Sequence, residues 1–179
     1  VRAAAQARAV VSLLCMARSV AQSSWLRATL SCMFASPIGP LRFAASDAGL
    51  TRVCFEGEQM LDDAPSDHPL ATQELAEYFA GTRREFTVPL DLSGVTEFRA
   101  AVLRELAKVP FGETTTYAQL ARAVGNPKAV RAVGSACATN PLPLFIPCHR
   151  VLRSDGQLGG YRGGVEAKRF LLRMEGIDV

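Results

Sequence analysis

The sequence has few of the residues that build disulfide frameworks and metal sites. Among its 179 residues there are two histidines and five cysteines, the latter at positions 15, 32, 54, 137 and 148. The cysteines are odd in number and none forms a C-x-x-C pair, so we expect neither a disulfide framework nor a structural zinc site. Thiols left free in this way are typical of proteins from a reducing cytosol.

Long apolar runs are also absent. The run at residues 9–17 is far shorter than the roughly 20 residues that a membrane-spanning helix needs. Residues 1–25 are rich in Ala, Arg and Ser, and we expect them to form an extension outside the fold. Such an extension is a targeting segment, an unstructured tail, or a stretch upstream of the true start, for which Met33 is a candidate.

Acidic side chains are missing from residues 1–46, which carry five arginines. Residues 47–109 hold twelve acidic and six basic side chains, whereas residues 110–179 hold five acidic and nine basic ones. A basic final third behind an acidic middle favours a polyanionic partner for the C-terminal part of the chain. The same excess of charge also fits an ordinary solvated surface, so the charge pattern alone does not identify a partner.

Turn residues and hydrophobic periodicity predict an α+β chain of two domains. Residues 26–90 should form the first, a small domain with an antiparallel sheet and a helix. Within it, residues 29–56 alternate between apolar and polar side chains in three short runs separated by turn signals, a pattern that predicts three strands. The helix should begin at Pro69 and end near Ala80.

The second domain, residues 91–179, should be mostly helical. Thr96 is a plausible N-cap for its first helix, whose apolar side chains form one stripe. Further helices are predicted at 116–124, 128–138 and 165–174. The first two of these flank a Gly-Asn-Pro turn at 125–127, which is the pattern of a helix-turn-helix.

The second helix of this pair is unusual for a DNA reader. In "KAVRAVGSACA", small residues stand where a major-groove helix carries Asn, Gln or several Arg to reach base edges. Small residues let a helix backbone approach a narrow surface such as a DNA minor groove, and Arg131 is the long cation near the middle. The alternative is a helix packed in the core, from which Arg131 extends to solvent.

The stretch "NPLPLFIPCHRV", residues 140–151, carries the most reactive side chains. Its prolines and apolar residues predict a stiff, buried, extended segment that presents Cys148 and His149 beside Arg150. An unperturbed thiol has a pKa near ~8.5, so basic neighbours are needed to make it a nucleophile. Consecutive side chains of an extended segment point to opposite faces, so we expect a water to join Cys148 to His149, with Glu175 orienting the imidazole. An inert buried cysteine is the alternative.

The motif "RAVGSACATNPLPLFIPCHRV" lies between "PFGETTTYAQLA" and "GGYRGG…LLRMEG". Together these stretches resemble the O6-alkylguanine-DNA alkyltransferases, the methylated-DNA–protein-cysteine methyltransferases. The resemblance is close over residues 96–179 and looser in "SPIGPLRFAASDAGLTRVCFEGE". It implies direct-reversal DNA repair in which Cys148 takes the alkyl group from O6-alkylguanine in duplex DNA, with O4-alkylthymine as a further candidate substrate. Because a thioether has no easy leaving group, the transfer should be irreversible and occur once per protein.

The resemblance also implies roles for individual residues. Cys148 would be the nucleophile, His149 its base through a water, and Glu175 the group that orients the imidazole. Tyr117 would press on a DNA phosphate and help to donate a proton to the leaving base. Asn140 would be a hinge between the helix pair and the active-site segment.

DNA contacts follow from the same resemblance. Arg131 would enter the minor groove and fill the gap left by a flipped nucleotide, whose extrusion costs a few kcal/mol. The other DNA-binding residues would be Tyr117, Lys128, Ala129, Ala132 and Gly134. The base pocket would be lined by Pro143, Val151, Tyr161 and Arg162, the last standing where some relatives carry a smaller residue. We expect no cofactor, a monomer, no membrane contact, and a cytoplasmic location, nucleoid-associated in a bacterium or nuclear in a eukaryote.

Three other classes of protein fit parts of the pattern. A Cys-His hydrolase or peptidase would form an acyl intermediate, but such enzymes bring the two residues from distant parts of the chain. A non-enzymatic sensor of alkylated DNA would lack the nucleophile that is present here as Cys148. A transcription factor that reads sequence with the helix pair is disfavoured by the small-residue helix.

Overall fold

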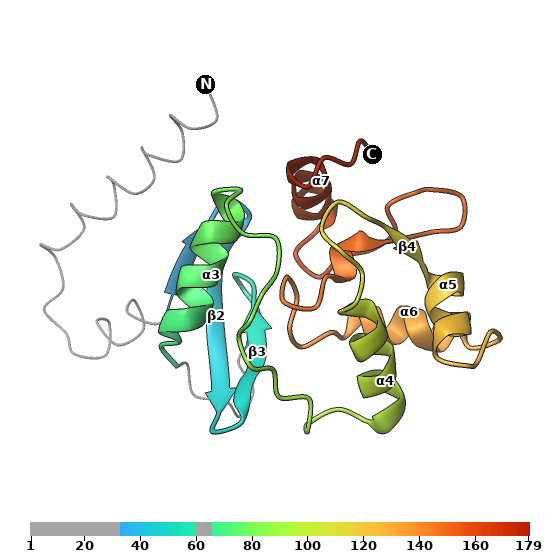
Figure 1. Ribbon diagram of the computed structural model, residues 1–179, viewed down its shortest axis with the longest axis horizontal. Helices are drawn as coiled ribbons and strands as arrows, with labels where there is room; N and C mark the ends of the chain where they lie inside the picture. The colour runs from blue at the N-terminus through green and yellow to red at the C-terminus, as the bar shows by residue number, and fades with distance from the viewer. Residues whose placement is uncertain (1–32, 60–65) are drawn as a thin grey trace, which may run out of the picture.

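The computed structural model describes residues 33–59 and 66–179, so the extension predicted at 1–25 lies outside the described residues. The N-terminal half is a sheet of three antiparallel strands in the order β1 (Met33–Ser36), β2 (Gly39–Ser46), β3 (Gly49–Cys54). Helix α3 (Pro69–Phe79) lies across one face of this sheet (Figure 1). The strands and the helix predicted for this part of the chain are confirmed.

A close backbone approach at the start of β3 joins the sheet to the segment that follows α3. Gly49 has φ +147°, and a Cβ at this position would lie 2.4 Å from the carbonyl oxygen of Pro89. The same carbonyl accepts a hydrogen bond of 2.8 Å from the backbone of Leu50, whose own carbonyl accepts one of 2.9 Å from Asp91. A glycine is needed here because any side chain would separate the two segments.

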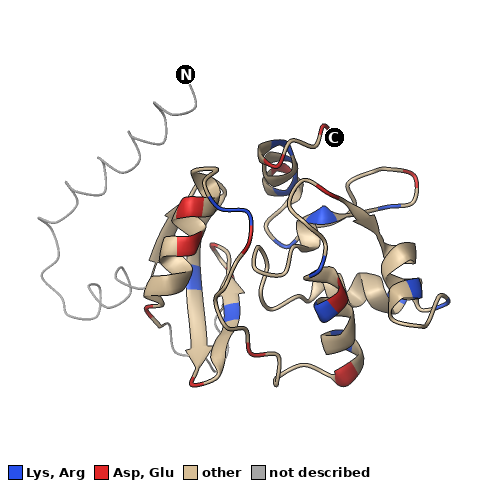
Figure 2. Ribbon diagram, in the orientation of Figure 1, with Lys and Arg blue, Asp and Glu red and all other residues tan. Residues whose placement is uncertain are grey.

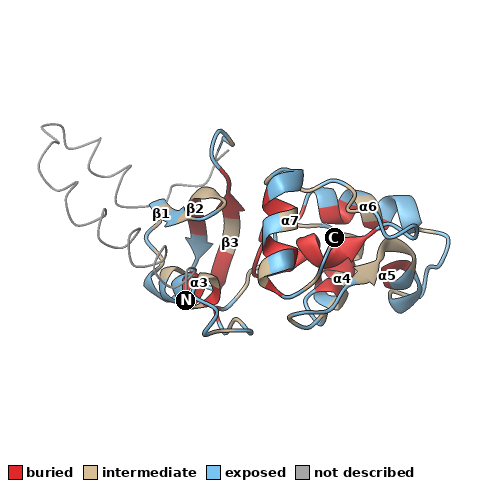
Figure 3. Cartoon of the chain, turned by 90° about the horizontal axis from the view of Figure 1, so that it is seen from above, coloured by how far each residue is buried: buried red, intermediate tan, exposed pale blue. Residues whose placement is uncertain are grey.

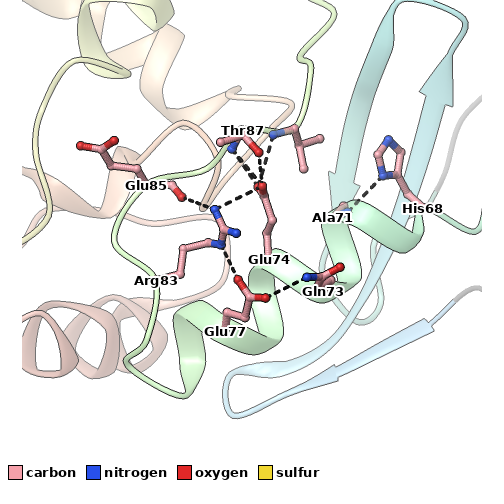
Figure 4. Close-up of polar contacts among 9 residues, drawn as sticks. His68, Ala71, Gln73, Glu74, Glu77, Arg83, Glu85 and Thr87 are labelled. Carbon is pink, nitrogen blue, oxygen red and sulfur yellow. Dashed lines mark hydrogen bonds and ion pairs between the residues drawn. The ribbon is translucent and has the colours of Figure 1, made fainter.

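A buried carboxylate fixes the other end of this segment to α3. Glu74 is fully buried, and its oxygens accept hydrogen bonds from the backbone N–H groups of Thr87 (2.9 Å) and Val88 (3.2 Å). Arg83 lies between Glu74 and Glu77, 3.3 Å from the first and 2.7 Å from the second (Figure 4). The segment that leads into the C-terminal half is therefore held by one side chain of α3.

Replacing this carboxylate should destabilise the protein. In Glu74→Ala, the N–H groups of Thr87 and Val88 lose their acceptor, and we expect the free energy of unfolding to fall by about 3 kcal/mol. Glu77→Ala is the matched control, because Glu77 is more exposed and its ion pair should contribute much less to stability. Urea denaturation of both variants measures the difference, and equal losses would contradict the assignment.

The C-terminal half contains four helices. These are α4 (Glu97–Leu106), α5 (Tyr117–Ala123), α6 (Val130–Ala138) and α7 (Val165–Met174). A capping box starts α5: Thr116 accepts from the backbone of Gln119 at 3.2 Å, and the Gln119 side chain accepts from the backbone of Thr116 at 2.7 Å. Thr96 precedes α4, but its side chain makes no capping hydrogen bond. Within the described residues no helix is long and apolar enough to cross a membrane.

Two short strands and a turn complete this half. β4 (Thr115–Thr116) pairs in parallel with β5 (Val151–Leu152), which brings the start of α5 beside the end of the Cys148 segment. Figure 1 shows α5 and α6 packed at one end of this half, with α7 near the C-terminus at the other. The helix-turn-helix is therefore present, with α6 beginning two residues later than the predicted position 128.

The two halves pack along a shared apolar boundary. Figure 3, which views the chain from above, shows buried residues in both halves. The backbone N–H of Val53 in β3 donates to the carbonyl of Pro141 at 2.8 Å. The rings of Phe86 and Phe145 lie 4.7 Å apart between centroids. Buried side chains from both halves belong to one core cluster. The sheet domain therefore supports the segment that carries Cys148.

Charge is unevenly distributed over the described helices. Helix α3 carries acidic but no basic side chains, whereas α5 and the turn after it carry Arg122 and Lys128 (Figure 2). The helix pair thus presents positive charge on the side of the molecule away from α3. This arrangement suits contact with a polyanion.

Candidate active site

Cys148, His149 and Arg150 lie in a single 3₁₀ turn. The prediction of an extended segment was wrong at these three residues. The turn closes because the backbone N–H of Arg150 donates to the carbonyl of Pro147 at 2.9 Å. In such a turn neighbouring side chains do not alternate between faces, and both His149 and Arg150 reach the same carboxylate, Glu175.

The loop before this turn is held in shape by Asn140. Its side chain is fully buried, donates to the carbonyl of Ile146 at 2.8 Å and accepts from the backbone of Leu142 at 3.0 Å. Leu144 lies between these contacts with φ +76°, a conformation that is strained for a side chain of its size. Asn140 directly follows Thr139, the C-cap of α6, so it connects the helix pair with the Cys148 turn.

Glu175, at the end of α7, is the centre of a buried polar cluster. His149 Nε2 lies 2.9 Å from Oε1, the Nε of Arg150 donates to Oε2 at 2.9 Å, and the hydroxyl of Tyr78 donates to Oε1 at 2.6 Å. Burial acts to raise the pKa of Glu175, but the hydrogen bonds from His149 and Arg150 outweigh it and lower the pKa to about 2. The carboxylate is therefore charged at neutral pH.

The protonation state of His149 follows from this carboxylate. Burial lowers the pKa of the imidazole despite the opposing effect of Glu175, so the ring is neutral at pH 7. Because Glu175 can only accept, the ring proton lies on Nε2. Nδ1 is then the acceptor, and it is buried with no hydrogen-bond partner among the described residues. A buried basic nitrogen without a partner is available to take a proton through a water.

The thiol of Cys148 is protonated in the free protein. Burial raises its pKa, and a hydrogen bond with Asn140 and the charge of Lys168 oppose this effect only in part. Lys168 is itself fully buried on α7, where its Nζ donates to the carbonyl of Val151 at 2.6 Å and burial lowers its pKa to about 8. Cys148 therefore needs a base before it can act as a nucleophile.

A pocket of about 370 Å³ opens onto Cys148. Its lining residues are Tyr117, Gly134, Cys137, Ala138, Cys148, Gly160, Tyr161 and Arg162. Of the four residues expected to line a base pocket, Tyr161 and Arg162 line this pocket at Cys148. Pro143 and Val151 are buried, and they are not among the lining residues.

The helix pair frames the mouth of this pocket. Tyr117 is the first residue of α5, and Gly134 lies on α6; both line the pocket. Arg131, Lys128 and Ala132 are exposed on α6 and on the turn before it, and Ala129 is half-buried at its N-cap. The residues that were expected to contact DNA thus lie on the elements that border the pocket.

Sequence reasoning missed three contributors to the site. Tyr78 lies 97 residues before Glu175, and nothing in the chain near either residue indicates that they meet. Arg150 was expected beside the thiol but not as a partner of Glu175. Lys168 lies seven residues before Glu175 on α7, so two helical turns place both on one face, a signal that could have been used.

Tyr78 should affect the pKa of His149 through Glu175, without contact to a substrate. In Tyr78→Phe, Glu175 loses one hydrogen-bond donor. The negative charge of its carboxylate then interacts more strongly with His149, so the pKa of His149 rises. We expect the acid limb of the pH–rate profile of the reaction at Cys148 to move to higher pH, with a stability loss of roughly 1.5–3 kcal/mol. Single-turnover rates between pH 5 and 9 measure this. A rate that fell at every pH, with the acid limb unmoved, would leave Tyr78 with a packing function alone.

Comparison with known proteins identifies the family. A model of the DNA-binding domain of 6-O-methylguanine DNA methyltransferase matches residues 97–177, and a model of the ribonuclease-like domain of the same enzyme matches residues 30–92. A methylated-DNA–protein-cysteine methyltransferase from Methanosarcina acetivorans is 41% identical over 151 residues, covering 80% of this chain and 96% of that protein. The constitutive enzyme of Bacillus subtilis is 42% identical over 155 residues and covers 80% and 93%.

Solved structures agree with these sequence matches. The crystal structure of Mycobacterium tuberculosis O6-methylguanine methyltransferase superposes with a TM-score of 0.73 at 40% identity, covering 80% of this chain and 90% of that one. A structure of the Mycobacterium tuberculosis protein OGT in complex with DNA gives a TM-score of 0.75 with the same identity and coverage. The chain therefore belongs to the 6-O-methylguanine DNA methyltransferase family, and it is a DNA-binding repair enzyme of the methylated-DNA–protein-cysteine methyltransferase class.

Proposed function

We propose that the protein transfers the alkyl group of O6-alkylguanine in duplex DNA to Cys148, once per molecule. The observation that carries this proposal is a buried thiol that lines a pocket, followed in the chain by a histidine. Among the described residues, Nδ1 of this histidine has no hydrogen-bond partner, while its Nε2 is held by a charged carboxylate. This combination supplies a nucleophile, a base and a group that orients the base.

The proposed reaction is a displacement at the alkyl carbon. The proton of Cys148 passes through a water to Nδ1 of His149, and the charge of Glu175 stabilises the imidazolium that forms. The sulfur then forms a bond to the alkyl carbon while the bond from that carbon to O6 breaks. The electron pair leaves with the guanine, which is protonated with the help of the Tyr117 hydroxyl at the pocket mouth. Normal guanine and S-alkylcysteine are the products.

The target base must leave the helix to reach this pocket. We propose that α6 lies in the minor groove, with Ala129, Ala132 and Gly134 permitting the close approach and Lys128 contacting the backbone. Arg131 fills the space left by the rotated nucleotide. Extruding a base costs a few kcal/mol, and the cation offsets part of this cost only where a duplex is present. The protein acts as a monomer in the cytoplasm, where a reducing environment keeps Cys148 free.

Mass spectrometry tests the proposed reaction directly. Reduced protein is mixed with an excess of duplex carrying one O6-methylguanine, and the peptide containing Cys148 is weighed after digestion. The expected result is a gain of one methylene on that peptide, with no more than one per protein however long the incubation. A parallel duplex with O4-methylthymine tests the second substrate. Lesion binding without any mass gain would show a sensor instead of a repair enzyme.

Arg131 should matter for duplex substrates alone. For Arg131→Ala we expect the transfer rate on duplex O6-methylguanine to fall by about 100-fold, since roughly 2–3 kcal/mol of support for the flipped state is lost. The rate on a single-stranded oligonucleotide should change by less than about threefold. Lys128→Ala is the comparison. Loss of a contact to the DNA backbone should weaken the binding of the duplex and the single-stranded substrate alike, so the ratio of their rates should not change. If Arg131→Ala lowered the transfer rate equally on the duplex and the single-stranded substrate, Arg131 would have no role in base flipping.

A further inference from the structure

A short parallel ladder brings Arg153 beside Tyr117. Strand β4 pairs with β5 so that Thr116 lies opposite Leu152. The next residues along the chain are Tyr117, which starts α5, and Arg153, which follows β5, so the two leave the ladder as neighbours. Tyr117 lines the pocket at Cys148. The ladder therefore places an arginine next to the wall of this pocket.

Gly159 shows how close the two side chains are. This glycine has φ +65°, and a Cβ at its position would lie 3.2 Å from the hydroxyl oxygen of Tyr117 and 3.5 Å from Cγ of Arg153. Both side chains therefore pass over the same glycine, with little room for a further side chain between them. The backbone of Arg153 is fixed as well, because its N–H donates to the carbonyl of Gln157 at 2.9 Å and its carbonyl accepts from Gly156 at 3.0 Å.

The guanidinium of Arg153 faces solvent. Its side chain is 56% exposed, and it makes an ion pair of 3.1 Å with Asp155, two residues further along the chain. Asp155 is exposed too, so water screens this pair and it holds the cation weakly. A phosphate group can take the place of the Asp155 carboxylate, because the guanidinium fork matches the oxygens of both groups.

The charge of Arg153 also reaches the hydroxyl of Tyr117. Burial raises the pKa of this phenol, the thiols of Cys137 and Cys148 raise it further, and the charge of Arg153 lowers it. The mouth of the pocket thus combines a hydroxyl that donates a hydrogen bond with a nearby exposed cation. Hydroxyls and arginines are the side chains that typically bind the phosphates of DNA.

We propose that Arg153 binds a backbone phosphate of the DNA strand whose base enters the pocket, in exchange for Asp155; this inference rests on the entry of the base proposed above. A base inside the pocket leaves its sugar and its phosphates at the mouth, where Tyr117 and Arg153 lie. In the free protein Asp155 pairs with the guanidinium. When DNA binds, the phosphate replaces Asp155 and counterions leave the DNA.

Fluorescence anisotropy with an O6-methylguanine duplex, at a series of salt concentrations, tests this contact. All variants carry Cys148→Ser, so that no alkyl group is transferred during the measurement. For Arg153→Ala we expect the affinity at low salt to fall by about tenfold, and the slope of log K against log salt concentration to become less steep by about one. Arg153→Lys keeps the charge and should retain most of this slope.

Two further variants separate the contact from a general effect of charge. Asp155→Asn removes the competing carboxylate, so the affinity should rise by about twofold. Arg169→Ala is the matched control, because it removes the same charge from α7, where Arg169 pairs with Glu166 at 2.5 Å. This control should leave the slope unchanged.

Several outcomes would overturn the inference. If Arg153→Ala and Arg169→Ala change the slope equally, Arg153 contributes net charge and no phosphate contact. Weaker binding by Asp155→Asn would rule out the exchange of Asp155 for a phosphate. Should Arg153→Ala fail to fold in a thermal melt, Arg153→Gln replaces it. Protein with Cys148 intact that binds the duplex but gains no mass on its Cys148 peptide would defeat the proposed function, and the phosphate contact would stand.

Discussion

Cys148→Ser should abolish alkyl transfer while leaving lesion binding intact. The substitution keeps the size of the side chain, so the pocket and the 3₁₀ turn are retained. A serine hydroxyl is far harder to deprotonate than a thiol, and His149 alone cannot make it a comparable nucleophile. We expect the rate to fall by at least about 10³-fold, with no mass gain on the peptide that contains residue 148. Mass spectrometry after incubation with O6-methylguanine duplex measures this.

The other buried thiols provide the controls. Cys137 lines the same pocket, but burial, followed by the nearby Cys148, raises its pKa to about 12. Cys54 is buried in the sheet domain. Cys137→Ser and Cys54→Ser should both accept one methyl group at close to the wild-type rate. If Cys137→Ser were the inactive variant, the acceptor would have been misassigned within the correct pocket.

Glu175→Gln should lower both stability and the transfer rate. The amide keeps the shape of the carboxylate but leaves the buried guanidinium of Arg150 without its counter-charge. Breaking such a pair costs about 3 kcal/mol of folding free energy. The amide also cannot stabilise an imidazolium at His149, so we expect the rate to fall by about 100-fold. Urea denaturation and single-turnover kinetics measure the two effects.

The stability effect of Glu175 depends on pH in a defined direction. Its pKa in the folded protein is about 2, below the usual value of 4.5. A depressed carboxyl pKa stabilises the fold above pH 4.5, and this contribution is lost as the pH falls toward 2. The stability gap between wild type and Glu175→Gln should therefore narrow across this window. A gap that stays constant from pH 7 to pH 2 would contradict the assigned pKa.

Glu166→Gln is the matched control for this substitution. Glu166 lies on the same helix, α7, and pairs at its exposed surface with Arg169 at 2.5 Å. A surface pair of this kind contributes less than about 1 kcal/mol. We expect no change in the transfer rate and a stability within about 0.5 kcal/mol of the wild type. A larger effect of Glu166→Gln would show that the effects of Glu175→Gln come from the loss of negative charge on α7 and not from the buried cluster.

Local signals in the sequence determined the elements. Alternation of apolar and polar residues predicted the three strands, Pro69 and Gly81 marked the ends of α3, and the last helix occurs over Val165–Met174 as expected. These features depend on neighbours in the chain, so a local pattern is sufficient to recognise them. The segment at Cys148 is the exception. Prolines and apolar residues favour an extended chain and a tight turn alike, and the hydrogen bond from Arg150 to Pro147 decided for the turn.

The sequence by itself thus determined which residues could do the chemistry: a cysteine followed by a histidine, preceded in the chain by a helix pair whose second helix is made mainly of small residues. Only the tertiary structure decided which distant residues hold the side chains of the site in place. Tyr78 meets Glu175 across 97 residues, and Glu58 meets Arg162 across 104. Such contacts are made when the sheet domain packs against the helical one, and no short-range pattern encodes them. A buried charge is stable only beside suitable partners, and here the partners come from distant parts of the chain. The sequence alone therefore did not identify Tyr78 or Glu58 as partners.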